Sequence, residues 1–402
     1  MYIIVAMVRL ISKDVDLREL LNQIGSDPAS YGIFLDKDSH LRVWIDEVYY
    51  PAASVIKQEC LSCGADAAVH KHVITGKVER SSVLILANVR QLKCLVDKLR
   101  RMPYWGLSQI ADEIKSVLED KEARTFVLTM PNGTLELRRT KVMTILNATP
   151  DSFFPGSRVD LHTGLERAVD AEENGAAFID IGGASTRPGA AEIGEDEELR
   201  RVIPLLRQVR ERVKLFISVD TYRAEVAKQA LENGADLIND IYGLQFDKEM
   251  ANVIADYGVP VVIMHMRGTP ATMQEYASYD DLMKELHAYF VERVEYALSK
   301  GIKENQIILD PGIGFAKLPE HNLEVLRRIE ELFTLGFPVL VGHSRKSTMG
   351  KILGGVPAEE RLFGTVAWTS YLTWKGVHIV RVHDTKPNVD AVKAVEAIRE
   401  GI

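Results

Sequence analysis

From residue 142 onward, short apolar runs alternate with longer amphipathic segments, and this alternation restricts the fold more than any other feature. The runs are rich in Val and Ile, as buried β-strands are. They span residues 142–146, 178–181, 215–219, 237–238, 259–264, 307–309, 338–341 and 377–382. Helices are expected between them, for example over residues 161–173, 195–212, 223–233, 279–300, 323–335 and 357–374. Eight strand–helix units in about 260 residues predict a TIM (β/α)8 barrel, with a doubly wound parallel sheet as the competing architecture.

A turn signal precedes the first of these strands. Pro131-Asn132-Gly133 separates two β-prone runs, residues 125–130 and 134–138. An Asn-Gly pair between such runs is a strong β-hairpin signal. A hairpin placed here can cover one end of a barrel, so it favours a closed barrel over an open sheet.

The chain is too long for one hydrophobic core. It has 402 residues, whereas single cores stop growing beyond roughly 250–300 residues. Residues 120–124 are charged and poor in apolar side chains, as linkers are. We therefore expect a small α/β or α+β domain of unknown role at residues 1–121 and the barrel with its hairpin at residues 122–402. In the first domain we expect strands at 2–10, 39–48, 67–73 and 82–87, and helices at 15–23, 52–62, 90–100 and 107–118.

Composition excludes several classes of protein. With 46% hydrophobic and 26% charged residues, the chain is typical of globular proteins and unlike disordered ones. The net charge of −8 argues against non-specific nucleic-acid binding, so an anionic ligand needs a local basic cluster. No apolar run approaches membrane-spanning length, and residues 1–11 lack the basic lead-in of a signal peptide. We expect no nucleic-acid or membrane partner.

The three cysteines are too few for a disulfide framework, which favours a reducing compartment, the cytoplasm. Cys60 and Cys63 precede His70 and His72, and thiolates with imidazoles could bind zinc. Their spacing does not match the usual zinc finger, and a cysteine pair at a helix end is more often core packing. Cys94 lies in an apolar helical pattern and is also expected in the core.

A polar or charged side chain lies at the end of nearly every predicted barrel strand. In chain order these are Asn147, Asp180, Asp220, Asn239, His265, Asp310, the run Ser344-Arg345-Lys346-Ser347, Arg381 and His383. In a TIM barrel the carboxyl ends of the strands meet on one face, and active sites lie there. Polar residues at one or two strand ends would mean little, but their presence at every end indicates a site. No comparable group is visible before residue 140.

The loop after the second strand could hold an anion. Ser185-Thr186-Arg187-Pro188-Gly189 offers two hydroxyls and a guanidinium after the strand has ended at Gly182-Gly183. These groups suit a phosphate, although a polar turn between a strand and a helix explains the same residues.

The strand ends also carry specific motifs in a fixed order. They include Leu146-Asn-Ala-Thr-Pro-Asp-Ser-Phe153, Asp180-Ile-Gly-Gly-Ala-Ser-Thr-Arg-Pro-Gly189, Leu309-Asp-Pro-Gly-Ile-Gly-Phe315, Gly342-His-Ser-Arg-Lys-Ser347 and Arg381-Val-His-Asp384. Over residues 122–402 these motifs together resemble the dihydropteroate synthase family. The resemblance implies condensation of 6-hydroxymethyl-7,8-dihydropterin diphosphate with 4-aminobenzoate in folate biosynthesis, releasing diphosphate. Ala184 stands where the family usually has Glu, and residues 153–158 also depart from its pattern.

The resemblance assigns a pterin pocket to four of these residues. A pterin presents a guanidine-like row of donors beside a carbonyl acceptor, which carboxylates, an amide and an ammonium can match. Asp310 and Asn239 are expected at the donor edge, Asp220 at a neighbouring ring nitrogen and Lys346 at the carbonyl. Taken singly, Asp220 or Asn239 could be a helix cap or turn residue, and Lys346 a solvated lysine.

The resemblance also implies a diphosphate site. Asn147 would coordinate Mg²⁺, with diphosphate and water completing the oxygen ligands that this ion prefers. Arg381 and His383 alternate along one strand and so point to the same side, which makes a phosphate clamp geometrically easy. Thr186 and Arg187 are expected to close over the site from the second loop.

The remaining groups concern the second substrate and the pocket wall. Ser347 begins a helix whose free N–H groups could bind the benzoate carboxylate. Met264 and His265 could belong to the pocket wall or to the core. No protein nucleophile is required, because departure of diphosphate leaves a pterin-methyl cation; catalysis would come from charge neutralisation and positioning.

Two other functions stay open. A methyltransferase domain on the same barrel would also bind a pterin, but it needs no group that grips diphosphate. A non-catalytic pterin-binding protein would need neither Asn147 nor the phosphate-binding residues. The resemblance further implies a homodimer.

Overall fold

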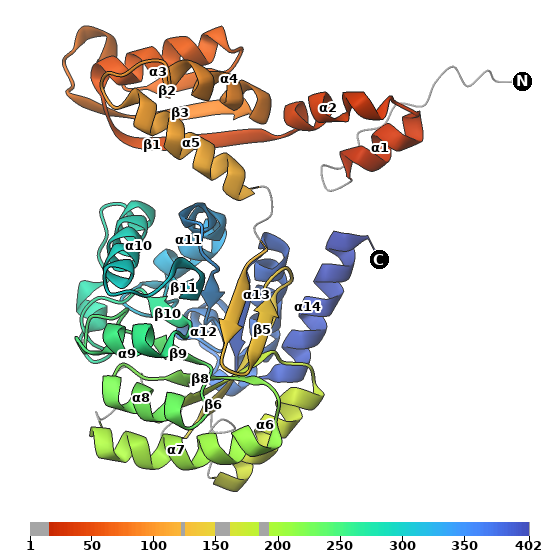
Figure 1. The fold of residues 1–402 in the computed structure, drawn as a ribbon, viewed down its shortest axis with the longest axis vertical. Helices are drawn as coiled ribbons and strands as arrows, with labels where there is room; N and C mark the ends of the chain where they lie inside the picture. The colour runs from red at the N-terminus through yellow and green to blue at the C-terminus, as the bar shows by residue number, and fades with distance from the viewer. Residues whose placement is uncertain (1–15, 122–124, 149–160, 185–192, 402) are drawn as a thin grey trace, which may run out of the picture. The chain divides into compact units, whose positions relative to one another are not determined.

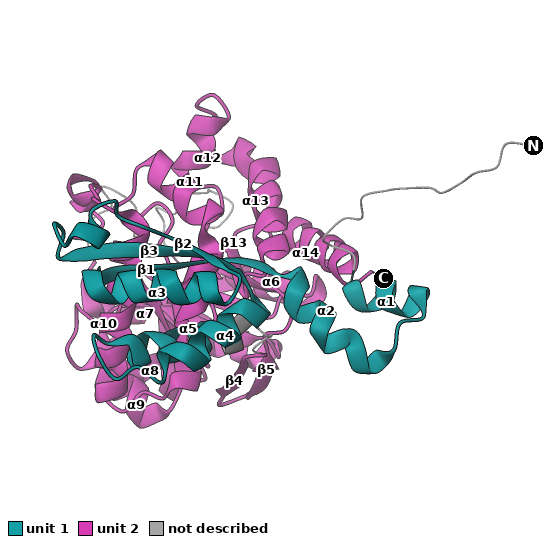
Figure 2. Ribbon diagram, turned by 90° about the horizontal axis from the view of Figure 1, so that it is seen from above, with its two compact units in different colours: residues 1–123 teal, residues 124–402 magenta. Residues whose placement is uncertain are grey.

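The computed structural model describes residues 16–121, 125–148, 161–184 and 193–401. The chain forms two compact units, residues 1–123 and 124–402, which Figure 2 shows in different colours. Within the described ranges, no helix is long and apolar enough to cross a membrane.

The larger unit is built on eight parallel strands (Figure 1). They are β6 (Lys141–Asn147), β7 (Phe178–Gly182), β8 (Phe216–Asp220), β9 (Leu237–Asp240), β10 (Val261–Met264), β11 (Ile307–Asp310), β12 (Leu340–Val341) and β13 (Ile379–Val382). The hydrogen-bonding order is β11-β10-β9-β8-β7-β6-β13-β12, and a parallel bridge between Leu309 and Val339 joins its two ends. The TIM barrel is therefore confirmed, because a doubly wound sheet would keep two free edges.

Helices cover the outside of the barrel. They are α6 (Leu161–Glu173), α7 (Glu195–Arg212), α8 (Ala224–Glu232), α9 (Met250–Tyr257), α10 (Leu282–Ser299), α11 (Pro319–Arg327), α12 (Ser347–Ile352), α13 (Leu362–Lys375) and α14 (Thr385–Glu400). The helix expected over residues 323–335 is wrong in extent. Proline suits a first helical turn, so α11 already begins at Pro319, and it stops where Arg328 adopts a ψ of 16°. A 3-10 helix, Ile329–Leu335, takes the place of its second half.

The amino ends of the barrel strands are closed by the predicted hairpin. β4 (Val127–Met130) and β5 (Gly133–Glu136) pair antiparallel. Leu128 and Met130 pack in one buried cluster with apolar residues from the strand starts, among them Phe178. At the turn, the backbone and side-chain amides of Asn132 donate to the buried carboxylate of Asp236 at 3.2 and 2.9 Å. The carboxyl ends of the strands are therefore the end left for a ligand.

The smaller unit contains a three-stranded antiparallel sheet in the order β1-β3-β2. Its elements are α1 (Leu17–Ile24), α2 (Tyr31–Asp38), β1 (His40–Tyr49), α3 (Tyr50–Ser62), β2 (Asp66–Val69), β3 (Arg80–Asn88), α4 (Val89–Leu99) and α5 (Leu107–Lys121). The strand expected over 67–73 ends at Val69. The helix α2 was not expected, and its apolar residues Ile33 and Phe34 are exposed. The strand expected over 2–10 lies outside the described residues.

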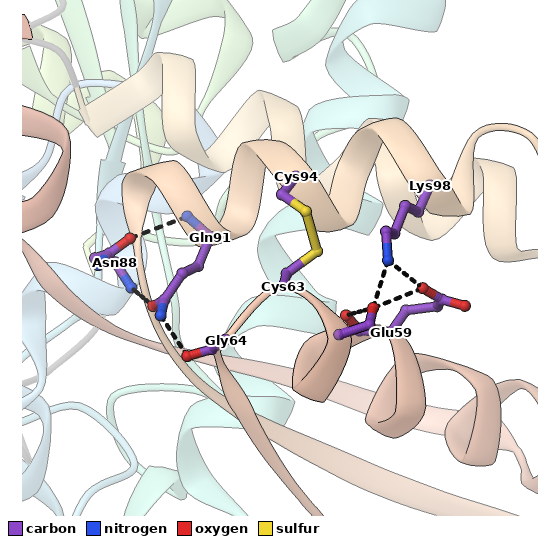
Figure 3. The surroundings of a disulfide bond; sticks show 8 residues. Glu59, Cys63, Gly64, Asn88, Gln91, Cys94 and Lys98 are labelled. Carbon is purple, nitrogen blue, oxygen red and sulfur yellow. Dashed lines mark hydrogen bonds and ion pairs between the residues drawn. A yellow bond between two sulfur atoms is a disulfide. The ribbon is translucent and has the colours of Figure 1, made fainter. Parts of the chain in front are cut away.

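The cysteines of the smaller unit do not form the expected core group. Figure 3 shows Cys63, just after α3, bonded to Cys94 on α4, with a Cα–Cα distance of 6.0 Å. Gln91 belongs to the capping box of α4 and donates to the Gly64 carbonyl at 2.5 Å. This hydrogen bond joins the end of α3 to the start of α4, close to the disulfide. Cys60 is a buried thiol whose pKa burial raises to about 12.

The expectations for the cysteines need two corrections. Cys94 is a disulfide partner and not a core thiol, and Cys63 is not available as a zinc ligand. Across the described residues, no three His, Cys, Asp or Glu side chains are grouped to hold a metal, so the alternative with His70 and His72 has no support. Position along α4 could not show that Cys94 faces the end of α3.

Candidate active site

The barrel brings candidate residues from neighbouring strands to one level. In the strand register Asn147 pairs with Gly182, Gly182 with Asp220, and Asp220 with Asn239. Asp310 ends β11 in the same way. These residues lie inside the strands, at or next to their carboxyl ends. The sequence analysis had placed them just after the strands. The face predicted to carry the site is the face on which they meet.

A partly buried arginine joins β7 and β8. Arg381, in β13, donates from Nε to Asp180 Oδ2 at 2.5 Å and from Nη2 to Asp220 Oδ2 at 2.7 Å. Asp180 is completely buried, and the Arg381 side chain is 17% exposed. The sequence analysis gave Asp180 no role. Its signal was present, since a carboxylate inside the apolar run of β7 needs a cationic partner.

Burial raises the pKa of two carboxyl groups of the site. The pKa of Asp220 rises to about 7, chiefly through burial and further through Asp180, although Arg381 opposes the rise. The pKa of Asp310 rises to about 6 through burial, against the Gly312 N–H that donates to its Oδ1 at 2.8 Å and against Lys346. Two carboxyl groups with raised pKa values mark this end of the barrel as a candidate functional site.

Several buried polar atoms in the barrel have no partner within the described part of the chain. On the strands they are Asp180 Oδ1, Asn239 Oδ1 and the hydroxyl oxygen of Ser218, which lies opposite Asp180 in the register; Glu198 Oε1 and Thr373 Oγ1 lie on the surrounding helices. The Asn239 amide donates its Nδ2 to Asp180 Oδ2 at 3.3 Å. Leaving such acceptors unsatisfied costs about 1–3 kcal/mol each, so their grouping indicates a ligand that brings hydrogen-bond donors.

Lys346 and Phe315 form one wall of the site. Lys346 precedes α12, and its Nζ lies 4.4 Å from the centre of the Phe315 ring. Burial lowers the pKa of Lys346 to about 8; Arg381 lowers it further, while Asp310 and Asp220 oppose the shift. Phe315 is 7% exposed and was missed by the sequence analysis, because an aromatic residue after a strand is usually core. A flat apolar ring beside an ammonium suits a planar ligand that carries an acceptor.

The backbone of Arg345 holds Lys346 in place. Arg345 has a φ of 54°, in the left-handed region that side chains other than glycine rarely adopt. Its guanidinium binds both carboxylate oxygens of Asp384 at 2.8 Å and donates to the carbonyls of Ala358 and Glu359 at 2.6 and 2.9 Å. These bonds compensate for the strained backbone and so fix the direction of the next residue, Lys346.

Cationic groups surround His383. Burial lowers its pKa well below the ordinary value, and Arg381, Arg345, Lys346 and Arg167 lower it further. The neutral ring is placed by Ser344, whose hydroxyl lies 2.9 Å from His383 Nδ1. Arg345 and Arg381 are already paired with carboxylates. The further positive charge beside a neutral imidazole suits a bound anion.

Behind the pocket, His265 is structural. Its Nδ1 lies 2.8 Å from the ammonium of Lys317, which is 3% exposed and also donates to the Phe315 carbonyl at 3.2 Å. Burial lowers the pKa of Lys317 to about 7 and that of His265 well below its usual value. Gly312, with a φ of 66°, packs against the same histidine; a Cβ there would lie 2.2 Å from the His265 carbonyl. Met264 is likewise buried in an apolar cluster, so both residues belong to the core behind the pocket wall.

Three expected features remain to be placed, two of them outside the described residues. Thr186 and Arg187 lie outside the described residues, as does the loop expected to depart from the family pattern at residues 153–158. Ser347 is described and exposed, and α12 has only six residues.

The fold and the grouped polar residues define a TIM barrel with a candidate active site at the carboxyl ends of its strands. Residues 143–383 match the model of the pterin binding enzyme family, which gives the class of the protein. The chain is 47% identical over 262 residues to a dihydropteroate synthase of Synechocystis, which covers 65% of this chain and 91% of that protein. It belongs to the dihydropteroate synthase family.

Solved structures agree with this assignment. The dihydropteroate synthase of Yersinia pestis in complex with a sulfonamide drug is 44% identical, with a TM-score of 0.66, and the match covers 68% of this chain and 99% of that one. The enzyme of Thermus thermophilus in complex with 4-aminobenzoate is 41% identical, with a TM-score of 0.61 and the same coverage.

The smaller unit has relatives of a different kind. A probable bifunctional folylpolyglutamate synthase/dihydropteroate synthase of Halobacterium salinarum is 38% identical over 391 residues. That match covers 96% of this chain and 46% of that protein, so it includes the smaller unit.

Proposed function

We propose that this protein is a dihydropteroate synthase that joins 6-hydroxymethyl-7,8-dihydropterin diphosphate to 4-aminobenzoate. The carbon–oxygen bond to diphosphate breaks and leaves a pterin-methyl cation; the amine nitrogen then forms a bond to the methylene carbon, and the amine proton leaves to solvent. The observation that carries the proposal is the adjacency of two chemistries: unsatisfied buried acceptors in the barrel, and cations around His383.

The pterin is proposed to lie against the buried acceptors. Asn239 Oδ1 and the Asp310 carboxylate accept from its donor edge, Asp220 meets a ring nitrogen, and Lys346 donates to its carbonyl. The raised pKa of Asp220 supports this role, because a carboxyl that titrates near neutral pH can donate to or accept from a ring nitrogen. Phe315 would stack beside the ring.

The diphosphate is proposed to lie among Arg381, His383 and Lys346, with Thr186 and Arg187 from the second loop. The Asn147 side chain fits a role in holding Mg²⁺: it is half-exposed beside Gly182 and offers a neutral oxygen. Mg²⁺ takes few protein ligands when a substrate supplies phosphate oxygens. The ion would neutralise the leaving group; the protein cations hold and orient it.

The aminobenzoate is proposed to bind near Phe315 and Ser347. We also propose the homodimer and the cytoplasmic location that the sequence suggested. The location has lost part of its basis, because the Cys63–Cys94 disulfide is not expected of a reduced compartment.

Turnover assays with both substrates test the function. Dihydropteroate and diphosphate should appear in equal amounts, and chelation should stop the reaction until Mg²⁺ is returned. Full activity after chelation would remove Asn147 from its proposed role. Methyl transfer from a reduced folate to a corrinoid, with no diphosphate release, would instead support the methyltransferase alternative; binding of the pterin without either reaction would leave a binding protein.

A further inference from the structure

Asp180 is the buried residue that contacts both halves of the proposed site. It lies in the middle of β7, between Ile145 of β6 and Ser218 of β8 in the register, and has no exposed surface. One of its oxygens accepts from Arg381 and from Asn239. Arg381 belongs to the diphosphate half of the proposed site and Asn239 to the pterin half.

The contact with Arg381 sets the plane of the guanidinium. Asp180 binds its Nε at 2.5 Å while Asp220 binds one terminal nitrogen at 2.7 Å. Two carboxylates bound to different nitrogens leave a planar group little rotational freedom. A diphosphate can accept hydrogen bonds from the N–H groups of Arg381 that these two carboxylates do not bind.

The contact with Asn239 sets the orientation of an amide. A side-chain amide can present either its donor or its acceptor in a given direction. Because Asn239 Nδ2 donates to Asp180, its Oδ1 is turned away from that carboxylate and stays buried without a partner among the described residues. The amide is thereby fixed as an acceptor for a ligand donor.

We propose that Asp180 is a positioning residue that fixes Arg381 for diphosphate and Asn239 for the pterin. The proposal rests on the proposed function. The simpler role is neutralisation of a buried arginine, which would affect the stability of the barrel but not the orientation of Asn239. An isosteric substitution separates the two roles, since Asp180→Asn keeps the volume, removes the charge and can itself donate to Asn239.

The experiment measures the binding of two fragments, 6-hydroxymethylpterin and inorganic diphosphate with Mg²⁺, to the full chain by calorimetry. Asp180→Asn should weaken each by roughly 10–100-fold, as the loss of a charged hydrogen bond does. Asp236→Asn is the matched control: it removes an equally buried partner of an arginine, Arg210, at the hairpin end of the barrel. It should lower stability and leave both affinities unchanged.

A double variant identifies the route of each effect. In an Arg381→Gln background, Asp180→Asn should weaken diphosphate binding no further, because Asp180 acts on diphosphate through Arg381. It should still weaken pterin binding, which runs through Asn239. Asp180→Asn with both affinities within about twofold of wild type overturns the proposal, and so does an unchanged pterin affinity alone. Absence of turnover in the wild type would instead overturn the proposed function, so the two failures are distinguishable.

Discussion

The two ends of the barrel are built from the same eight strands and have opposite chemistry. At the amino ends, residues such as Phe178 and Leu237 pack with the hairpin in a cluster that is entirely apolar. Two residues after Phe178, the same strand carries Asp180, which is equally buried but charged. In the first cluster no polar side chain takes part, whereas the strands near the second end carry buried polar atoms without a partner among the described residues, as at Asp180 and Asn239.

This difference separates residues that stabilise the fold from residues that bind. Burying unpaired polar groups lowers stability, and functional sites are where proteins tolerate that cost. Substitutions at the hairpin end should therefore change the free energy of unfolding, and substitutions at the other end should change affinity.

The largest expected effect is at the hairpin end. Phe178→Ala removes a fully buried ring that lies 5.9 Å from the ring of Phe216, and should lower the free energy of unfolding by about 3–5 kcal/mol. Chemical denaturation measures it. Pterin affinity, measured where the variant is still folded, should not change; a parallel loss of affinity would show that the two ends are coupled.

The next effect is at the ligand end. Lys346→Met keeps the length of the side chain and removes its charge, so pterin affinity should fall by about 2–3 kcal/mol, or roughly 30–150-fold. Stability should hold or rise, because the lysine is charged at a buried site. Lys228→Met, at an exposed position on α8, is the control and should change neither quantity. Near-normal affinity in Lys346→Met would contradict the pocket assignment.

A further effect at the ligand end follows from pH. The pKa of Asp220 is raised by burial from 3.8 to about 7 in the folded barrel. Between these values the folded state holds a proton that the unfolded chain releases, so this group makes stability fall as pH rises from about 4 to about 7. Asp220→Asn removes that dependence. The variant should gain stability relative to wild type as pH rises, and unfolding curves at several pH values should show it; a constant difference would mean that Asp220 is already ionised throughout.

The smallest expected effect concerns the other unit. Every described candidate residue lies in the barrel unit, so a chain starting near Lys121 should fold alone and keep its turnover rate. Steady-state kinetics with and without separately added residues 1–121 measures this. Activity that returns only on addition of that piece would show that the smaller unit completes the active site.

The sequence alone identified the barrel, because the alternation of apolar runs and helices is a local pattern. The same pattern gave the ends of the strands and so predicted which polar residues lie at the carboxyl end of the barrel. Asp180 was recognised as a strand-end residue but given no role, because its partner Arg381 on β13 is known only from the fold. Phe315 was missed because an aromatic residue after a strand looks like core until its neighbour Lys346 is known. The Cys63–Cys94 bond was missed for the same reason, since α3 and α4 meet only in three dimensions. The broken helix at Arg328 depends on backbone geometry that an apolar pattern does not encode.

The disulfide gives the smaller unit a sensitivity to reductant that the barrel unit lacks. It spans 31 residues of the smaller unit, and closing a loop of that length removes unfolded-state entropy worth roughly 3–4 kcal/mol. The barrel unit contains no cysteine at all. A thiol in the purification buffer should therefore lower the melting temperature of the smaller unit selectively, and two melting transitions that coincide without reductant could separate in its presence.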